Sequence, residues 1–91
     1  MHANFIEVAV DSPMDSDRSG LHEVTIPRVR QLPGFVAGYW LEPVAGKGMS
    51  VVIYDDEASA RGAADMTKVG DSPIPGITIE RIETREVIGH A

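Results

Sequence analysis

Three residues of this sequence could take part in acid–base chemistry near neutral pH, the histidines His2, His22 and His90. An imidazole titrates close to neutrality, so a histidine that points into a cavity can act as a general base. His22 lies in the first turns of a predicted helix and is the candidate for that role; the alternative is a solvated helix residue beside Glu23. His2 and His90 lie near the ends of the chain, where nothing fixes the geometry of a side chain.

Three aromatic residues could bind or orient a planar compound. Tyr39 and Trp40 are adjacent in a predicted strand, so their side chains are expected on opposite faces of a sheet. One ring can then line a cavity and stack on a substrate, while the other packs at an interface. The alternative for both is plain packing. Tyr54 presents the same alternatives and adds a phenol that can donate a hydrogen bond.

Two turns contain residue types that are common in metal and phosphate sites. Residues 55–57 are Asp-Asp-Glu, but consecutive residues in a strand-to-helix turn do not converge on one ion, so helix capping explains them better. Residues 46–48 are Gly-Lys-Gly, without the spacing and the following helix of a phosphate-binding loop. The chain has 0 cysteines, which excludes disulfides and a cysteine nucleophile. We therefore expect neither a metal nor a cofactor.

Six regular segments must position these residues. Alternating apolar residues predict strands at residues 4–10, 35–42, 49–54 and 77–88. The second and third are joined by a turn at residues 43–48, in which Gly46 and Gly48 are free to take positive φ. Helices are predicted at residues 16–32, capped by Asp15 or Ser16, and at residues 56–68, with an inner face of small residues near Met66.

Two local features interrupt this regular pattern. Pro27 removes one hydrogen bond from the first helix and predicts a kink or a break there. In the last strand the apolar residues change phase, which predicts a β-bulge near Glu80 and Arg81. The charged residues of that strand are expected to form cross-strand ion pairs and a solvated or charged edge, and the alternative is a role in orienting two subunits.

The order β-α-β-β-α-β predicts an α+β fold of the ferredoxin-like class, a four-stranded antiparallel sheet with both helices on one face. With 91 residues, the chain is expected to form a single domain over residues 1–91. The net charge of −6 argues against nucleic-acid binding. No apolar run approaches the ~20 residues of a membrane span, and the first residues lack a basic-then-apolar signal. We expect a soluble cytoplasmic protein that binds neither nucleic acid nor membrane.

The central strands are apolar on both sides, which is unusual for a sheet with one face in water. Val51 and Val52 are adjacent and apolar, as are Val36 and Phe35. A large exposed apolar patch is uncommon on soluble monomers. The sequence therefore predicts that a second copy of the chain covers the sheet face opposite the helices, in a two-fold homodimer.

Several short motifs carry a resemblance to a known family. They are Gln-Leu-Pro-Gly-Phe at residues 31–35, Gly-Tyr at 38–39, Gly-Lys-Gly at 46–48 and Tyr-Asp-Asp-Glu-Ala at 54–58. With Pro27, they resemble the dimeric α+β barrel superfamily, and within it the antibiotic-biosynthesis-monooxygenase-like (ABM-like) proteins, especially small actinobacterial members. The resemblance implies a homodimer whose two sheets form a barrel, with a small-molecule cavity between each sheet and its helices.

Some members of that superfamily oxidise aromatic polyketides without a metal or flavin, and others degrade haem. The haem-degrading members use an Asn on the first strand, a Trp in the sheet and a His late in the second helix. Asn4 and Trp40 match the first two positions, but residues 56–68 contain no His, so haem degradation is rejected. Asn4, Tyr39 and Trp40 stay as candidates for binding a ligand.

Two functions from different classes follow from this reasoning. The first is a cofactor-independent monooxygenase that acts on a small aromatic or apolar compound, with His22 and Tyr54 as candidate catalytic residues. An electron-rich substrate anion can react with oxygen directly, so such a protein need only bind, deprotonate and exclude water. The second is a non-catalytic homodimer that binds a small ligand or serves as an accessory protein.

Overall fold

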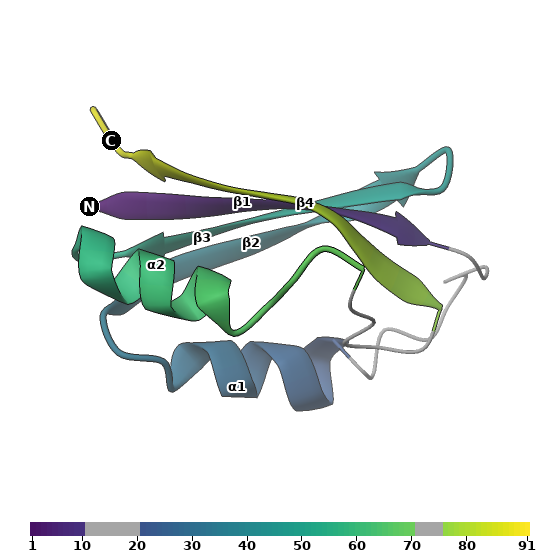
Figure 1. The fold of residues 1–91 in the computed structure, drawn as a ribbon, viewed down its shortest axis with the longest axis horizontal. Coiled ribbons are helices and arrows are strands. Elements are labelled where there is room, and N and C mark those ends of the chain that lie inside the picture. Colours follow the sequence, from purple (N-terminus) through teal and green to yellow (C-terminus); the bar gives the residue numbers. More distant parts are fainter. Residues whose placement is uncertain (11–20, 71–75) are drawn as a thin grey trace.

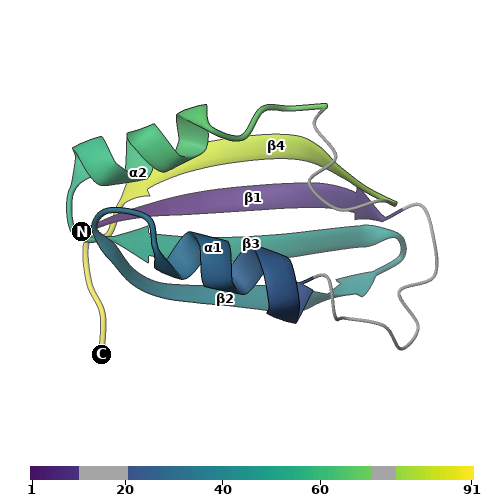
Figure 2. The same cartoon turned by 90° about the horizontal axis from the view of Figure 1, so that it is seen from below.

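Both helices lie on one face of a four-stranded antiparallel sheet. The computed structural model describes residues 1–10, 21–70 and 76–91. Figure 1 shows the sheet as one layer with the helices as a second layer beneath it, and Figure 2 shows the same helices in front of the strands. The predicted α+β class, with four antiparallel strands and two helices, is confirmed. The bounds of the elements are β1 (His2–Val10), a π-helix (Leu21–Thr25), α1 (Ile26–Arg30), β2 (Phe35–Val44), β3 (Lys47–Tyr54), α2 (Glu57–Asp65) and β4 (Ile77–Glu86).

The strand order is β2-β3-β1-β4, so β1 and β3 are central and β2 and β4 are the edges. Asn4 of β1 lies opposite Val52 of β3 on one side and Thr84 of β4 on the other. Directly opposed residues share a face of the sheet. Val52 and Tyr54 belong to the buried core between the sheet and the helices, so the even-numbered residues of β1 and β3 face the helices. The odd-numbered residues point to the other side, which we call the open face.

The predicted bulge in β4 is confirmed. Glu7 lies opposite Arg81, but the next residue of β1, Val8, lies opposite Ile79. Glu80 is therefore the extra residue of the bulge. The bulge slips the side-chain alternation by one position, which lets both Ile79 and Ile82 face the helices.

The β2–β3 hairpin is longer than predicted and its turn is shorter. Val44 lies opposite Lys47, so only Ala45 and Gly46 connect the strands, with φ of 54° and 78°. Two residues at positive φ match the twist of the flanking strands. The expectation that Gly48 belongs to the turn is wrong, because Gly48 lies buried in β3. A Cβ atom at Gly48 would approach the Val8 side chain to 2.9 Å, so this glycine serves close packing.

The first helical segment differs from the single helix predicted at residues 16–32. Its described part is a π-helix followed by the five-residue α1, with Pro27 in the first turn of α1. Thr25, directly before α1, also has helical backbone angles (φ −68°, ψ −52°), so Pro27 follows helical residues and removes one hydrogen-bond donor from this segment. The predicted break at Pro27 is wrong, because the π-helix continues directly into α1 and the helix runs through Pro27 to Arg30. Only the type of helix changes, from π to α, at Ile26. The predicted caps, Asp15 and Ser16, lie outside the described residues.

The second helix begins as predicted and ends sooner. The Asp56 carboxylate accepts a hydrogen bond from the backbone N–H of Ser59 at 2.7 Å, which caps α2. The helix ends at Asp65 instead of residue 68, and Met66 is exposed instead of lying near the inner face. Ala60 is fully buried against the core residues Val52 and Tyr54. The partly buried residues packed on that core are Val29, Leu32, Phe35, Trp40 and Ala63.

The end strands differ from their predicted bounds by two residues each. β1 begins at His2 and β4 ends at Glu86. A backbone hydrogen bond of 2.8 Å from Val87 N–H to the Met1 carbonyl extends the ladder between them. Among residues 1–10, 21–70 and 76–91, no helix is long and apolar enough to span a membrane.

Candidate functional site

Trp40 lies between the sheet and the helices, where the family resemblance implies a ligand site. It is opposite Ser50 in the β2–β3 pair and packs against the core from the helix side. Its indole ring folds back along β2 and lies over Gly38. A Cβ atom added at Gly38 would approach the ring to 2.9 Å. The absence of a side chain at Gly38 therefore makes room for the indole.

Tyr39 points the other way, as alternation along a strand requires. It lies opposite Val51 on the open face and is 61% exposed. Of the two adjacent aromatic residues, Trp40 is the one in the layer between sheet and helices, and Tyr39 is on the surface.

Tyr54 lies at the end of β3 in the buried core, with only 2% of its surface exposed. Burial raises the pKa of the Tyr54 phenol above its ordinary value, because the charged form loses hydration. The phenol is therefore neutral at physiological pH. In that state it can donate a hydrogen bond, but it cannot serve as a strong base.

Asn4 is buried and both ends of its amide are engaged. Its Nδ2 donates to the backbone carbonyl of Ala60 in α2 at 2.8 Å, and its Oδ1 accepts from Thr84 Oγ1 at 2.8 Å. Asn4 thus links the central strand β1 both to the inner face of α2 and to β4. These two hydrogen bonds give Asn4 a structural role, which is to hold α2 and β4 against β1. Its polar atoms are committed within the chain.

Of the three histidines, only His2 lies beside an aromatic residue of the core, because it is opposite Tyr54 in the β1–β3 pair and on the same face of the sheet. His22 is exposed on the π-helix and His90 is exposed beyond the end of β4. The expectation that His2 is unfixed is wrong, because His2 is the first residue of β1 and is partly buried. Its Nδ1 atom is buried and accepts or donates no hydrogen bond among the described residues.

The acidic turn before α2 is a helix cap, as predicted. Hydrogen bonds from the backbone and side chain of Ser59 hold the pKa of Asp56 below its ordinary range. Asp55 donates its backbone N–H to the carbonyl of Gly34 at 2.8 Å. Within the described part of the chain, no group of three or more His, Cys, Asp or Glu side chains could hold a metal ion. The turn therefore joins α2 to the segment before β2.

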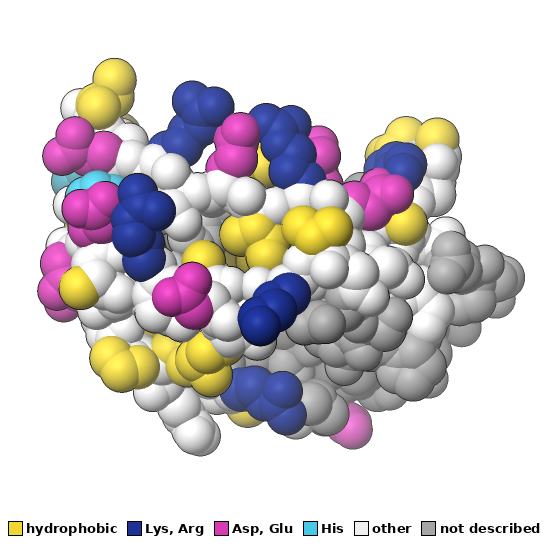
Figure 3. Space-filling view, in the orientation of Figure 1, with side chains coloured by type: hydrophobic (Ala, Val, Ile, Leu, Met, Phe, Trp, Pro, Cys, Tyr) yellow, Lys and Arg dark blue, Asp and Glu magenta, His cyan; other side chains and the backbone are white. Residues whose placement is uncertain are grey.

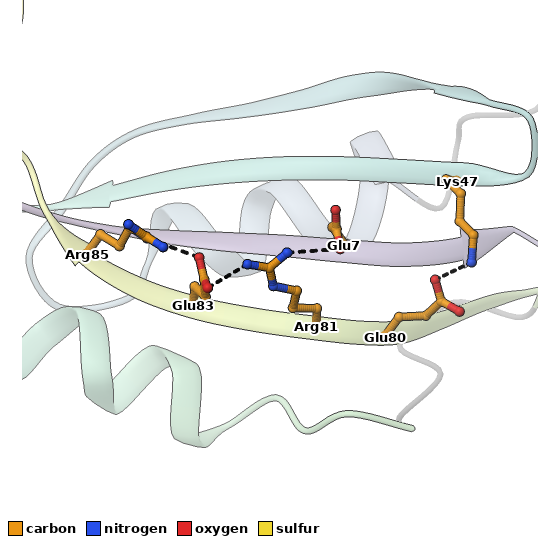
Figure 4. A network of polar contacts seen from close by, with 6 residues as sticks. All are labelled: Glu7, Lys47, Glu80, Arg81, Glu83 and Arg85. Carbon is orange, nitrogen blue, oxygen red and sulfur yellow. Dashed lines mark hydrogen bonds and ion pairs between the residues drawn. The ribbon is translucent and has the colours of Figure 1, made fainter.

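A network of ion pairs covers one side of the open face. Figure 4 shows Glu83 between two arginines, with Nη2 of Arg81 at 2.6 Å and Nε of Arg85 at 3.0 Å. Arg81 also reaches Glu7 of β1 at 3.8 Å, and Lys47 of β3 reaches across β1 to Glu80 at the bulge. The predicted cross-strand pairing is confirmed for Arg81 with Glu7. In Figure 3 basic and acidic side chains alternate along the upper margin of the molecule, over β4.

The ion pairs also set the charge states of this network. The hydrogen bonds from Arg81 and Arg85 hold the pKa of Glu83 below its ordinary range, and Glu83 in turn raises the pKa of Arg81. Glu83 and Arg81 are therefore both charged at neutral pH. Sequence reasoning found the alternation of charges on β4 but not the reach of Lys47, because that contact depends on the bulge and on the strand order.

Comparison with models of known protein families and with curated protein sequences finds no match to this chain.

Proposed function

We propose that this chain is the subunit of a homodimeric, ferredoxin-like dimeric α+β barrel, related to the ABM-like proteins, that binds a small aromatic or apolar compound between its sheet and its helices. The observation that carries the proposal is the position of Trp40. Its large planar ring lies on the helix side of the sheet over Gly38, with the Phe35 ring close by. Planar apolar compounds stack on such rings.

Tyr54 supports binding in the same layer. A neutral buried phenol offers a hydrogen bond to a ligand that is otherwise held by apolar contacts, which is the usual composition of a small-molecule site. Phe35 lies opposite Tyr54 in the β2–β3 pair, so the aromatic residues of the two strands are neighbours. Asn4 fixes the helix α2 that closes this layer.

The geometry favours binding over oxygenation. A cofactor-independent monooxygenase must remove a proton from its substrate before oxygen can react. Of the two candidate groups, His22 is exposed on the π-helix, and the buried Tyr54 has a raised pKa that makes it a donor. The monooxygenase remains the second candidate because of the resemblance to the ABM-like proteins.

A titration with planar aromatic compounds tests the proposal. Trp40 is the single tryptophan of the chain, so fluorescence excited selectively at tryptophan reports on this position alone. We expect a saturable fluorescence change and a rise in Tm, because a ligand at 100 times its Kd stabilises the native state by about 2.7 kcal/mol. Tyr39→Phe, on the opposite face, is the matched control and should bind unchanged. Trp40→Leu should bind at least tenfold more weakly, which is measured by the shift in Tm because this variant contains no tryptophan.

Oxygen consumption measured in the same titration separates the two functions. Binding without oxygen uptake supports the binding protein. Oxygen uptake that depends on a bound compound would replace that conclusion with the monooxygenase. A panel of hydroxylated polycyclic aromatics that changes neither fluorescence nor Tm would contradict the ligand site itself.

A further inference from the structure

His2 lies where the sheet meets the start of α2. It is opposite Tyr54 of β3 on one side and Glu86 of β4 on the other, and Tyr54 is in turn opposite Phe35 of β2. Directly opposed residues share a face, so this row of four lies on the helix side of the sheet. Figures 1 and 2 both show this end of β1 beside the first turn of α2. His2 therefore belongs to the layer between the sheet and the helices.

The Nδ1 atom of His2 lacks a hydrogen-bonding partner. Among the described residues it is the one buried side-chain nitrogen or oxygen atom without a hydrogen bond. Buried polar atoms are nearly always paired, because an unpaired one has lost its hydration without compensation. A site at which a single buried acceptor or donor is left over is suited to a molecule that supplies the missing partner.

The polar side chains nearest to His2 are already engaged within the chain. The amide of Asn4, which follows on the same face of β1, bonds to Ala60 and Thr84. The Asp56 carboxylate accepts the backbone N–H of Ser59. These groups hold the start of α2 in place. They leave the Nδ1 atom as the polar group of this part of the layer that can bind a ligand without breaking a contact of the fold.

The aromatic side chains place this nitrogen within reach of a ligand that stacks on Trp40. A Cβ atom at Gly38 would lie 2.9 Å from the Trp40 ring and 3.5 Å from the Phe35 ring, so the two rings meet over Gly38. Phe35 and His2 are in the same row, two strand spacings or ~10 Å apart, with Tyr54 between them. A planar compound that stacks on the two rings and extends past Tyr54 brings its far end to His2.

The charges around His2 favour a neutral polar group over an anion. Glu86 lies opposite His2, and Asp56 is close to it. The pKa of Asp56 is lowered chiefly by the hydrogen bonds from Ser59, and the charges of His2 and of the N-terminal amine add to this effect. Two carboxylates thus flank the imidazole, and they oppose a third. A hydroxyl group carries no charge and can donate a hydrogen bond to an imidazole nitrogen.

We infer that the Nδ1 atom of His2 accepts a hydrogen bond from a hydroxyl group on the compound that stacks on Trp40 and Phe35. His2 is then the residue that determines specificity in this layer, and the ligand class is a planar aromatic compound with a hydroxyl group at the end that faces β1. This inference rests on the proposed ligand site, and it adds the polar contact that selects the ligand.

Three compounds that differ only in one substituent test this contact. They are a naphthol, its methyl ether, which cannot donate a hydrogen bond, and the naphthoate of the same ring position, which is an anion. Binding is measured by calorimetry at about pH 8, above the ordinary titration range of histidine. The parent protein should bind the naphthol at least fivefold more tightly than the ether, the size of effect that one hydrogen bond supplies, and should bind the naphthoate most weakly.

Variants at His2 separate a hydrogen bond from a steric effect of the methyl group. His2→Leu removes the acceptor and should bind the naphthol and the ether equally, with the affinity for the ether unchanged. His2→Asn places an amide oxygen near the position of Nδ1 and should keep the preference for the naphthol. His90→Leu is the matched control, because His90 is exposed beyond the end of β4, and it should behave like the parent.

Four results would overturn the inference. Equal binding of naphthol and ether by the parent protein would show that Nδ1 is satisfied by water, and it would leave the ligand site standing. A preference that persists in His2→Leu would assign the hydroxyl to another group. Tighter binding of the naphthoate would exclude the neutral ligand class. A parent protein that binds none of the three compounds would overturn the proposed ligand site as well. The comparison on the parent protein holds even if a variant fails to fold.

Discussion

Tyr39 and Trp40 are neighbours on β2 that serve opposite faces of the same sheet. Trp40 packs between the sheet and the helices, over Gly38, and Tyr39 lies on the open face opposite Val51. Both parts of the proposed function follow from this division. The ligand site depends on the side of Trp40, and the contact between copies depends on the side of Tyr39. Variants at one position therefore act as controls for the other.

Gly38→Ala should destabilise the protein and displace the indole of Trp40. The new Cβ atom would lie 2.9 Å from the ring, and overpacking of this kind costs about 1–3 kcal/mol. Urea unfolding gives the free energy, and Trp40 fluorescence reports the displaced ring. Gly62→Ala is the control, because nothing lies within 4 Å of that position in α2. It should stabilise the helix by about 0.5–1 kcal/mol. Equal effects of the two substitutions would contradict the packing described for Trp40.

Asn4→Ala should be among the more destabilising single substitutions. It leaves the Ala60 carbonyl and the Thr84 hydroxyl without their buried partner, which costs about 1–3 kcal/mol for each group left unsatisfied. Thr84→Val removes only one of the two hydrogen bonds and should cost about 1 kcal/mol. Because the two residues share a bond, the double variant should lose less than the sum of the single losses. Additive losses in urea unfolding would show that the Asn4–Thr84 bond contributes nothing.

Gly34→Ala should destabilise more than Gly70→Ala, although both glycines have positive φ. The values are +76° and +95°, and an alanine in such a conformation costs about 1–2 kcal/mol. At Gly70 the added Cβ atom meets open space, whereas at Gly34 it would overlap the side chains of Asp55 and Ser59. Thermal unfolding of the two variants separates backbone strain from overlap. Equal losses would mean that the turn before β2 does not pack on the start of α2.

Asp56→Asn should reduce the loss of unfolding free energy that the protein shows as the pH falls into the acid range. The pKa of Asp56 is lower in the folded protein than in the unfolded chain, because the charged carboxylate accepts hydrogen bonds from Ser59. Its stabilising contribution is therefore complete above the unfolded pKa of about 3.9 and disappears as the pH falls through the lower, folded value. Asp55→Asn removes the same charge and keeps this cap, so it should show the same loss as the parent protein. Urea unfolding from pH 2 to 7 compares the three proteins, and identical curves would contradict the cap.

Most of the sheet could be predicted from local patterns, because the alternation of apolar and polar residues along a strand shows which of its side chains are buried. The phase change between Ile79 and Ile82 was sufficient to place the bulge at Glu80, and the acidic residues before α2 were sufficient to identify its cap. The turn was harder. Ala45 adopts a positive φ that its residue type disfavours, because the twist of the flanking strands requires it there.

The candidate site was less predictable, since its contacts join residues far apart in the sequence. Asn4 has the residue type of a ligand-binding side chain, but its amide bonds to Ala60 and Thr84, 56 and 80 residues away. No local pattern carries that information. Alternation along β2 required Tyr39 and Trp40 to separate, yet which of them faced the helices depended on the pairing with β3.

Sedimentation equilibrium of the unlabelled protein at micromolar concentration tests most directly whether a second copy covers the open face. We expect a mass of twice the 9.8 kDa of one chain, and dissociation when Tyr39→Lys places a charge among the apolar side chains of the open face. A protein that sediments at 9.8 kDa throughout this concentration range would contradict the central claim.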